Sequence, residues 1–278
     1  MSSTDSPTLI ADLARARVLP DVAATLVAAD LVPLVGGVPM VMTRADDEIT
    51  GTSRVLVVPV RPDVPLPAEV VDEVLRVARD RHPDCDELLL AVRHTPAHPD
   101  ARPHMRYVVA GPEVAVTAPP PGWSVRRARP ADRADVEDLL VRALVRGYPG
   151  AAVGEDVFGE HARAVYEAAV DTGAVFLAHR DGAFAGHLTL LSDVDELTGE
   201  ERLELFDLYL LPEGAGGGSA LTSAAVRVAR ELGLPLRGHV SGGGASADAV
   251  HAALLAKGWL PDVGYWSLPP ARPGGGVR

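Results

Sequence analysis

A dense run of glycines joins a predicted strand to a predicted helix, and this junction constrains the fold more than any other feature of the sequence. Residues 208–221 are LYLLPEGAGGGSAL, an apolar strand, a proline, a glycine-rich turn and the start of an amphipathic helix. Such a turn aims several backbone N–H groups at one point, at the positive end of the helix dipole. The segment therefore predicts a phosphate-binding turn within an α/β fold.

The bulk composition narrows the classes of protein to consider. The chain has 278 residues, a length that suits two domains, and a net charge of −12. So acidic a protein is poorly suited to nucleic acid or anionic membrane, and it attracts cationic molecules. Cys85 is the single cysteine, and no signal peptide or membrane span is recognised, so we expect a cytoplasmic protein. A homodimer is compatible with these properties.

A stiff, proline-rich stretch at residues 111–122 predicts a boundary between two domains. The first, residues 1–115, is expected to be a small α/β domain, and the second covers residues 123–268. Periodicity in the first predicts helices at 8–29 and 67–81 and strands at 38–43, 53–60, 87–93 and 106–110. In the second it predicts strands at 123–128, 174–179, 183–192, 203–211, 236–240 and 263–268, and helices after Asp132 and at 158–171, 219–232 and 246–257.

Two familiar phosphate-binding motifs fit the glycine turn badly. A P-loop closes with Lys followed by Ser or Thr, whereas Gly218 is followed by Ser219 and Ala220. A dinucleotide fingerprint needs a third glycine where Ser219 stands, and a carboxylate at the end of the next strand. Residues 238–240, which end that strand, are Gly-His-Val. The P-loop is therefore excluded and the dinucleotide interpretation is weak.

A third interpretation rests on the position of the turn after Pro212. The segment resembles the signature R/Q-x-x-G-x-G/A of the GCN5-related N-acetyltransferases, with Gly218 and Ala220 in the matching positions. Ala215 departs from it, because the family has Arg or Gln there. Residues 125–132, 207–212 and 253–259 are also similar to the family's first strand, fourth strand and last helix. The resemblance implies a mixed central sheet flanked by helices, preceded by a smaller α/β domain.

This resemblance implies acetyl-CoA as a co-substrate. The backbone of Leu208 and Leu210 would bind the pantetheine arm. The pyrophosphate would lie on the turn, and the residues in that role are Gly216, Gly217, Gly218, Ser219 and Ala220. No metal is expected, because the spacing of His94, His98 and His104 fits no common zinc pattern.

Acetyl transfer to an amine needs a neutral nitrogen, and an alkylamine is only about 0.1 per cent neutral at pH 7. A general base therefore helps. Glu204 lies eight residues before Pro212, where the family often has a glutamate base, and it shares strand parity with Leu208 and Leu210. Asp207 is the second candidate, since it has the opposite parity unless a bulge intervenes. The competing interpretation of Glu204 is an ordinary charge at a strand start.

The family's usual acid, a tyrosine in the last helix, is replaced by Leu254. The substitutes considered are Tyr209, Ser241, Ser246, Tyr265 and water.

Together these features predict an acetyl-CoA-dependent N-acetyltransferase acting on a primary amine of a small metabolite, natural product or peptide N-terminus. The alternative is a non-catalytic acyl-CoA-binding regulator. The order strand, helix, strand from residue 53 also predicts a degenerate acetyltransferase-like repeat in the first domain. No glycine turn joins that strand to its helix.

Overall fold

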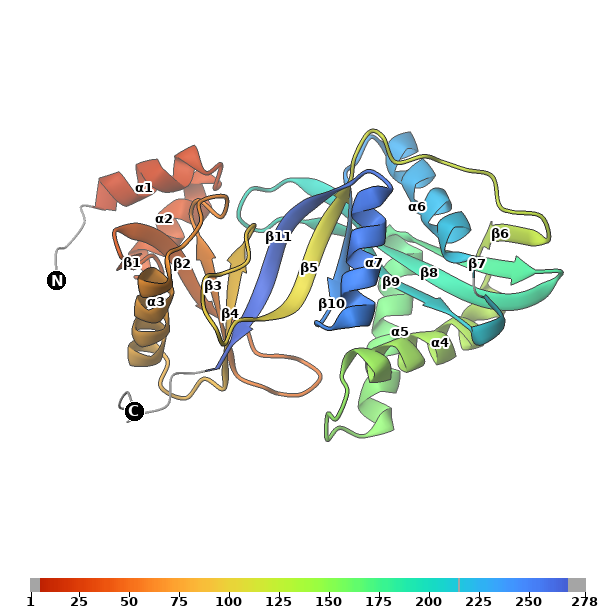
Figure 1. Cartoon of the computed structure of the whole chain (residues 1–278), viewed down its shortest axis with the longest axis horizontal. Coiled ribbons are helices and arrows are strands. Elements are labelled where there is room, and N and C mark those ends of the chain that lie inside the picture. Colours follow the sequence, from red (N-terminus) through yellow and green to blue (C-terminus); the bar gives the residue numbers. More distant parts are fainter. Residues whose placement is uncertain (1–5, 215, 270–278) are drawn as a thin grey trace.

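The computed structural model describes residues 6–214 and 216–269. Within these, eleven strands form one mixed sheet in the order β1-β2-β3-β4-β11-β5-β10-β9-β8-β7-β6, with helices on both faces (Figure 1). The predicted mixed sheet flanked by helices is confirmed. No helix in the described part of the chain is long and apolar enough to cross a bilayer.

The N-terminal half, as we call residues 6–110, contains three helices and five strands. They are α1 (Ser6–Arg15), α2 (Pro20–Ala28), β1 (Leu34–Val35), β2 (Val38–Arg44), β3 (Arg54–Pro59), α3 (Ala68–Arg81), β4 (Glu87–Val92) and β5 (Arg102–Ala110). The single helix predicted over residues 8–29 is wrong. Arg17 adopts φ 64° and Pro20 starts α2, so the chain turns between the two helices. The Leu19 N–H donates to the Leu197 carbonyl in the other half (2.8 Å).

The C-terminal half, residues 123–268, contains six strands and four α-helices. They are β6 (Trp123–Arg127), α4 (Arg133–Gly147), α5 (Glu155–Thr172), β7 (Ala174–Arg180), β8 (Ala183–Val194), β9 (Glu201–Leu210), α6 (Gly218–Leu232), β10 (Leu236–Ser241), α7 (Ala245–Ala256) and β11 (Trp259–Leu268). A short 3-10 turn, Pro212–Gly214, joins β9 to the glycine run.

The two halves repeat one topology. In each, two antiparallel strands are followed by a helix and a strand parallel to the second: β2-β3-α3-β4 in the first half and β8-β9-α6-β10 in the second. The repeat predicted for the first domain is therefore present. Apolar clusters lie on both faces of each half, and the cluster beneath α6 includes Leu188, Leu203, Leu221 and Trp259.

Each half places its last strand in the sheet of the other. β5 pairs antiparallel with β10, β11 pairs antiparallel with β4, and the two exchanged strands pair with each other at the centre of Figure 1. Leu268, at the end of β11, is fully buried in the apolar core under α3. The stretch at residues 111–122 therefore connects two halves that share one sheet, because each half contributes a strand to the other.

This exchange predicts that a C-terminal residue stabilises the N-terminal core. We expect Leu268→Ala to lower the free energy of unfolding by about 2–5 kcal/mol, because it leaves a cavity among buried side chains. Leu260→Ala, on the same strand, removes a side chain that is 54% exposed and should cost under about 0.5 kcal/mol. Urea unfolding followed by fluorescence and circular dichroism measures both. Equal losses for the two variants would contradict the assignment of Leu268 to that core.

Candidate functional site

β9 and β10 begin as parallel neighbours and then separate. Their pairing runs from Leu203↔Leu236 to Leu205↔Gly238, although β9 continues to Leu210 and β10 to Ser241. Beyond Leu205 the edge of β9 that faces β10 has no strand partner in the described sheet. The backbone groups along this edge are therefore available to a ligand that lies between the strands.

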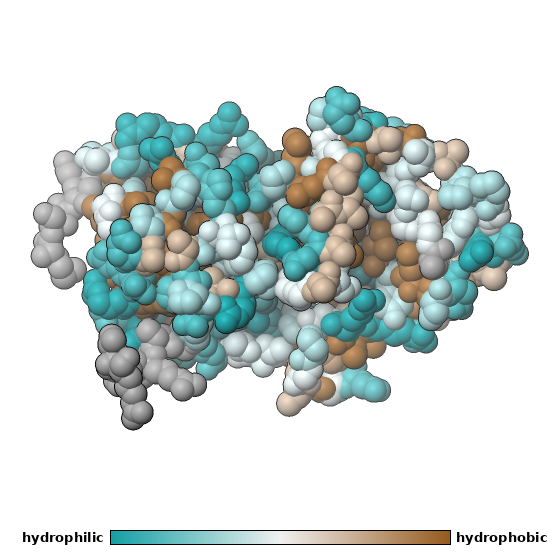
Figure 2. Space-filling view, viewed as in Figure 1, coloured by the Kyte–Doolittle hydropathy of each residue, from teal (hydrophilic) through white to brown (hydrophobic). Residues whose placement is uncertain are grey.

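Three adjoining cavities follow this separation. The helix-end cavity, about 850 Å³, lies at the start of α6 and is lined by Leu210, Gly216, Gly218 and Ser219. The interstrand cavity, about 530 Å³, lies between β9 and β10 and shares Thr222, Leu254 and Trp259 with the first. The junction cavity, about 870 Å³, is lined by both halves and shares Asp207, His239 and Ser241 with the second. On the face in Figure 2, hydrophobic residues gather in the hollow between α6 and α7.

Three of the five residues predicted to bind pyrophosphate line the helix-end cavity, and the other two pack into the structure around it. Gly216, Gly218 and Ser219 line the helix-end cavity. Gly217 packs under Trp123, where a Cβ would collide with the indole ring, so glycine is needed there for packing. The Ala220 side chain is buried, and its N–H donates to the Gly217 carbonyl (3.1 Å). The expected role of Ala220 as a phosphate donor is therefore not supported by this geometry.

Gly216 adopts φ +97°, in the region that favours glycine, and a Cβ there would meet open space. The first turn of α6 follows directly, and apart from the N–H of Ala220, which is already bonded, N–H groups at the start of a helix lack intrahelical acceptors. This combination can accept an anion. Ala215, where the sequence departs from the family signature, lies outside the described residues.

A β-bulge in β9 changes which predicted residues face each other. Thr189 pairs with Asp207 and Leu190 pairs with Leu205, so Phe206 is an extra residue on β9. The predicted parity is therefore wrong: Leu208 and Leu210 pack toward the cluster beneath α6, while Glu204 and Asp207 both line the junction cavity. Leu208 lines the interstrand cavity and Leu210 the helix-end cavity.

Two histidines pair with the candidate carboxylates. His239 Nδ1 lies 3.4 Å from Glu204 Oε1, and both side chains are mostly buried. His187 Nε2 lies 2.9 Å from Asp207 Oδ2, and His187 is fully buried. These pairs bridge neighbouring strands and become apparent only with the register of the sheet.

The junction cavity takes part of its wall from the N-terminal half. Burial, and after it the charge of Glu204, raises the pKa of Tyr107. Burial and then the positive charge of Arg54 lower the pKa of His104. Tyr148 follows the end of α4, and burial together with the adjacent Asp47 raises its pKa to about 12. At neutral pH these three side chains are therefore uncharged.

The charges of the junction cavity come from carboxylates and arginines. Arg54 is paired with Asp47 and also with Glu87 (2.7 Å). In the described part of the chain neither Glu204 nor Asp207 forms an ion pair with an arginine. The end of the cavity near β9 therefore carries negative charge, which favours a cationic ligand.

The residues considered as proton donors to the leaving group lie in different parts of the three cavities or outside them. Leu254, at the position of the family tyrosine, lines both the helix-end and interstrand cavities. Ser246 and Tyr209 line the interstrand cavity, and Ser241 lines the interstrand and junction cavities. The Tyr265 ring packs edge-on against Tyr107, with centroids 5.5 Å apart.

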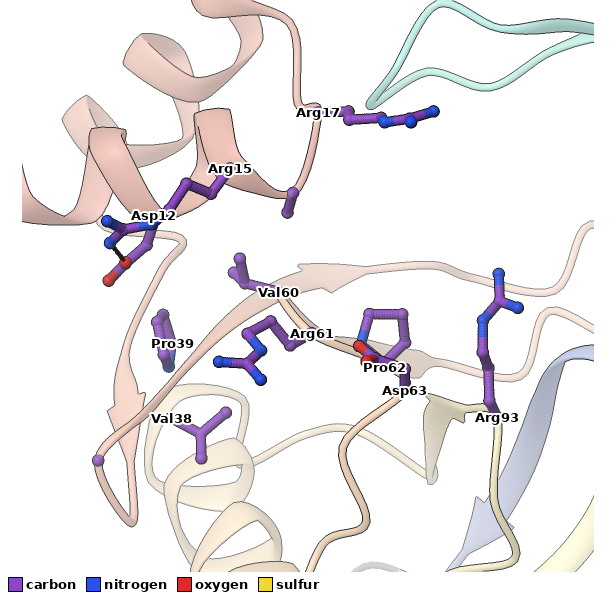
Figure 3. Close-up of a pocket in the computed structure, with 12 residues that line it drawn as sticks. Asp12, Arg15, Arg17, Val38, Pro39, Val60, Arg61, Pro62, Asp63 and Arg93 are labelled. Atoms are coloured by element: carbon purple, nitrogen blue, oxygen red, sulfur yellow. Dashed lines mark hydrogen bonds and ion pairs between the residues drawn. The ribbon is translucent and has the colours of Figure 1, made fainter.

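A separate cavity of about 770 Å³ lies in the N-terminal half, between α1, the β1–β2 hairpin and the loop after β3 (Figure 3). Of its four arginines, Arg15 pairs with Asp12, Arg17 with Glu200 and Arg93 with Asp262. The loop after β3 contains Pro62, Pro65 and Pro67, which have no N–H to donate. The repeat therefore lacks a counterpart of the glycine turn.

No group of three or more His, Cys, Asp or Glu side chains in the described chain is placed to hold a metal ion. His98 pairs with Asp72 (3.3 Å), and His94 Nε2 lies 2.8 Å from the Asp63 carbonyl.

Comparisons with known proteins agree with this architecture. No protein-family model and no curated protein matches the sequence. The structure is similar to a GCN5-related N-acetyltransferase from Sphaerobacter thermophilus, with 14% identity, a TM-score of 0.51 and coverage of 97% of this chain and 93% of that one.

More distant similarities are to a tandem GNAT protein from the clavulanic acid biosynthesis pathway and to a GCN5-related N-acetyltransferase from Kribbella flavida. The first has 16% identity, a TM-score of 0.48 and coverage of 96% of this chain and 97% of that one. The second has 17% identity, a TM-score of 0.46 and coverage of 97% and 95%. The assignment rests on the Sphaerobacter structure, whose similarity spans both halves: the chain has the fold of the GCN5-related N-acetyltransferases.

Proposed function

We propose that this protein is an acetyl-CoA-dependent N-acetyltransferase that acts on a primary amine of a small metabolite, natural product or peptide N-terminus. The observation that carries the proposal is the separation of β9 and β10 beyond Leu205. A glycine turn and a helix N-terminus lie at one end of the separation, and two carboxylates lie at the other.

The residues along this path fit acetyl-CoA. Gly216, Gly218 and Ser219 would hold the pyrophosphate, because they line the cavity at the positive end of α6. The open backbone edge of Leu208 and Leu210 would hold the pantetheine arm. Bound there, acetyl-CoA supplies an acetyl group activated as a thioester.

Glu204 is the proposed general base. It lines the junction cavity, 18% of its side chain is exposed, and the His239 ring lies beside it. The carboxylate accepts a proton from the amine of the acceptor, directly or through water, as the nitrogen attacks the carbonyl carbon. Asp207, on the same wall because of the bulge, holds the amine by its negative charge.

The leaving thiolate takes its proton from water or from Ser241 or Ser246, since Leu254 cannot donate one. A thiolate is a tolerable leaving group, so the leucine is compatible with turnover. Tight acetyl-CoA binding without transfer to any amine would instead indicate a non-catalytic acyl-CoA-binding regulator.

Calorimetry with acetyl-CoA, CoA and NAD tests the ligand, and thiol release over a panel of amines and peptides tests the reaction. We expect heat with acetyl-CoA and CoA, no heat with NAD, and amine-dependent thiol release. The absence of heat with acetyl-CoA at high micromolar concentration would end the proposal.

A charge placed at the start of α6 should repel the pyrophosphate without harming the helix. Ser219 is exposed in the first turn, so Ser219→Glu complements the helix dipole. We expect the affinity for CoA to fall by about tenfold or more, because a carboxylate then competes with the phosphates. Ser219→Gln has nearly the same shape and should change it by less than about threefold. Calorimetry measures both affinities, and equal weakening by Glu and Gln would argue for a steric effect.

Replacement of the base should matter most when the amine is protonated. We expect Glu204→Gln to lower kcat/KM by about 10²-fold at pH 7 and by less near pH 9.5, where more of the amine is neutral. Glu200→Gln, whose side chain is 65% exposed and paired with Arg17, is the control and should leave the rate unchanged. A pH–rate profile of Glu204→Gln parallel to that of the wild type would remove Glu204 from the role.

A further inference from the structure

His187 is a fully buried ionisable residue in the middle of β8. Its direct neighbours across the sheet are Leu177 on β7 and Tyr209 on β9. Neither of its ring nitrogens makes a hydrogen bond in the described structure, and neither does the buried hydroxyl of Thr189, two residues along the strand. Buried polar groups cost free energy unless they are paired, so an apolar residue at this position would suit the core better.

His187 lies at ion-pair distance from Asp207, although the two atoms are not aligned for a hydrogen bond. Nε2 lies 2.9 Å from Oδ2, and the side chain of Asp207 is 16% exposed, so the carboxylate lies between the buried histidine and the open cavities. Asp207 lines both the interstrand and the junction cavity, whereas His187 is not among the lining residues of either. The histidine therefore reaches these cavities through Asp207.

The bulge at Phe206 creates this contact. It places Asp207 opposite Thr189 and diagonal to His187, on the face that looks toward the junction cavity. In a regular strand of the same sequence Asp207 would have the parity of Leu205 and would point to the apolar cluster beneath α6, because strand residues alternate between faces. The bulge and the buried histidine thus act on the same carboxylate.

We propose that His187 is a positioning residue: it holds the Asp207 carboxylate toward the cavity so that it receives the amine of the acyl acceptor. A ring fixed by complete burial, with Nε2 2.9 Å from Oδ2, restricts the rotamers that the Asp207 side chain can adopt. The inference rests on the proposed acetyl transfer and extends it to a residue that does not touch the acceptor.

Kinetics of His187→Leu and His187→Gln, each made alone and with Asp207→Asn, test the role. The probes are cadaverine, phenethylamine and glycinamide with acetyl-CoA. We expect His187→Leu to raise the KM for amine by about tenfold or more and to leave the KM for acetyl-CoA within about twofold. The Gln variant retains an N–H donor, so we expect its KM for amine to lie close to that of the wild type. In the Asp207→Asn background His187→Leu should raise the KM for amine by less than about a further twofold, because the two residues act as one unit.

The matched control is His179→Leu on the neighbouring strand β7, whose ring packs against Phe184 (centroids 5.9 Å apart). It should leave both KM values within about twofold. Equal effects of His179→Leu and His187→Leu, or an undiminished effect of His187→Leu in the Asp207→Asn background, would overturn the positioning role. If His187→Leu does not fold, the Gln variant and the spectra described next decide.

Ring ¹⁵N spectra of the histidines give a readout that needs no turnover. The chain has nine histidines, and the signals of His187 are those lost in His187→Gln. We expect Asp207→Asn to move the Nε2 signal of His187, and unmoved signals would overturn the inference. A wild-type protein that releases no thiol with any amine would overturn the proposed function. Thiol release with an unaltered KM for amine in His187→Leu would overturn only the role of His187.

Discussion

The antiparallel pairing of β5 with β11 is the interaction on which the rest of the structure depends. These are the last strands of the two halves, and each has been inserted beside the strands of the other half. Their shared hydrogen bonds join two repeats into one sheet, and their side chains complete both cores: Leu268 closes the core under α3, and Trp259 closes the one beneath α6. The junction cavity exists because the two halves are held side by side in this way.

Within that sheet, two local irregularities build the site. The parallel pairing of β9 with β10 stops at Leu205, which leaves an open backbone edge that leads to the glycine turn. One residue later the bulge at Phe206 turns Asp207 to the same face as Glu204. A regular sheet would have closed the edge and separated the two carboxylates. The chemistry proposed for this protein thus depends on departures from ideal strand geometry.

Much of this could be predicted from the sequence, because the signals are local. The glycine turn and the periodicity of α6 identified the junction of strand and helix, and the strand–helix–strand order identified the repeat in the N-terminal half. The bulge could not be predicted, since apolar residues lie on both faces of β9 and either register leaves the pattern LELFDLYL plausible. The exchange of β5 and β11 depends on pairing between residues far apart in the chain, which periodicity does not report. The pairs His187–Asp207 and His239–Glu204 follow from that register and were missed for the same reason.

The exchanged strands also determine how this molecule can open. In a protein built from two lobes joined by a linker, the lobes can swing about a hinge and close over a ligand. Here any such motion would break the hydrogen bonds of β5 and β11, which lie between the walls of the junction cavity. The walls are therefore rigid with respect to each other, and the junction cavity has its shape before any ligand binds. In the proposed reaction, selection among amines then rests on the side chains that line this cavity, and a change in the preferred amine requires substitutions there rather than a change in flexibility.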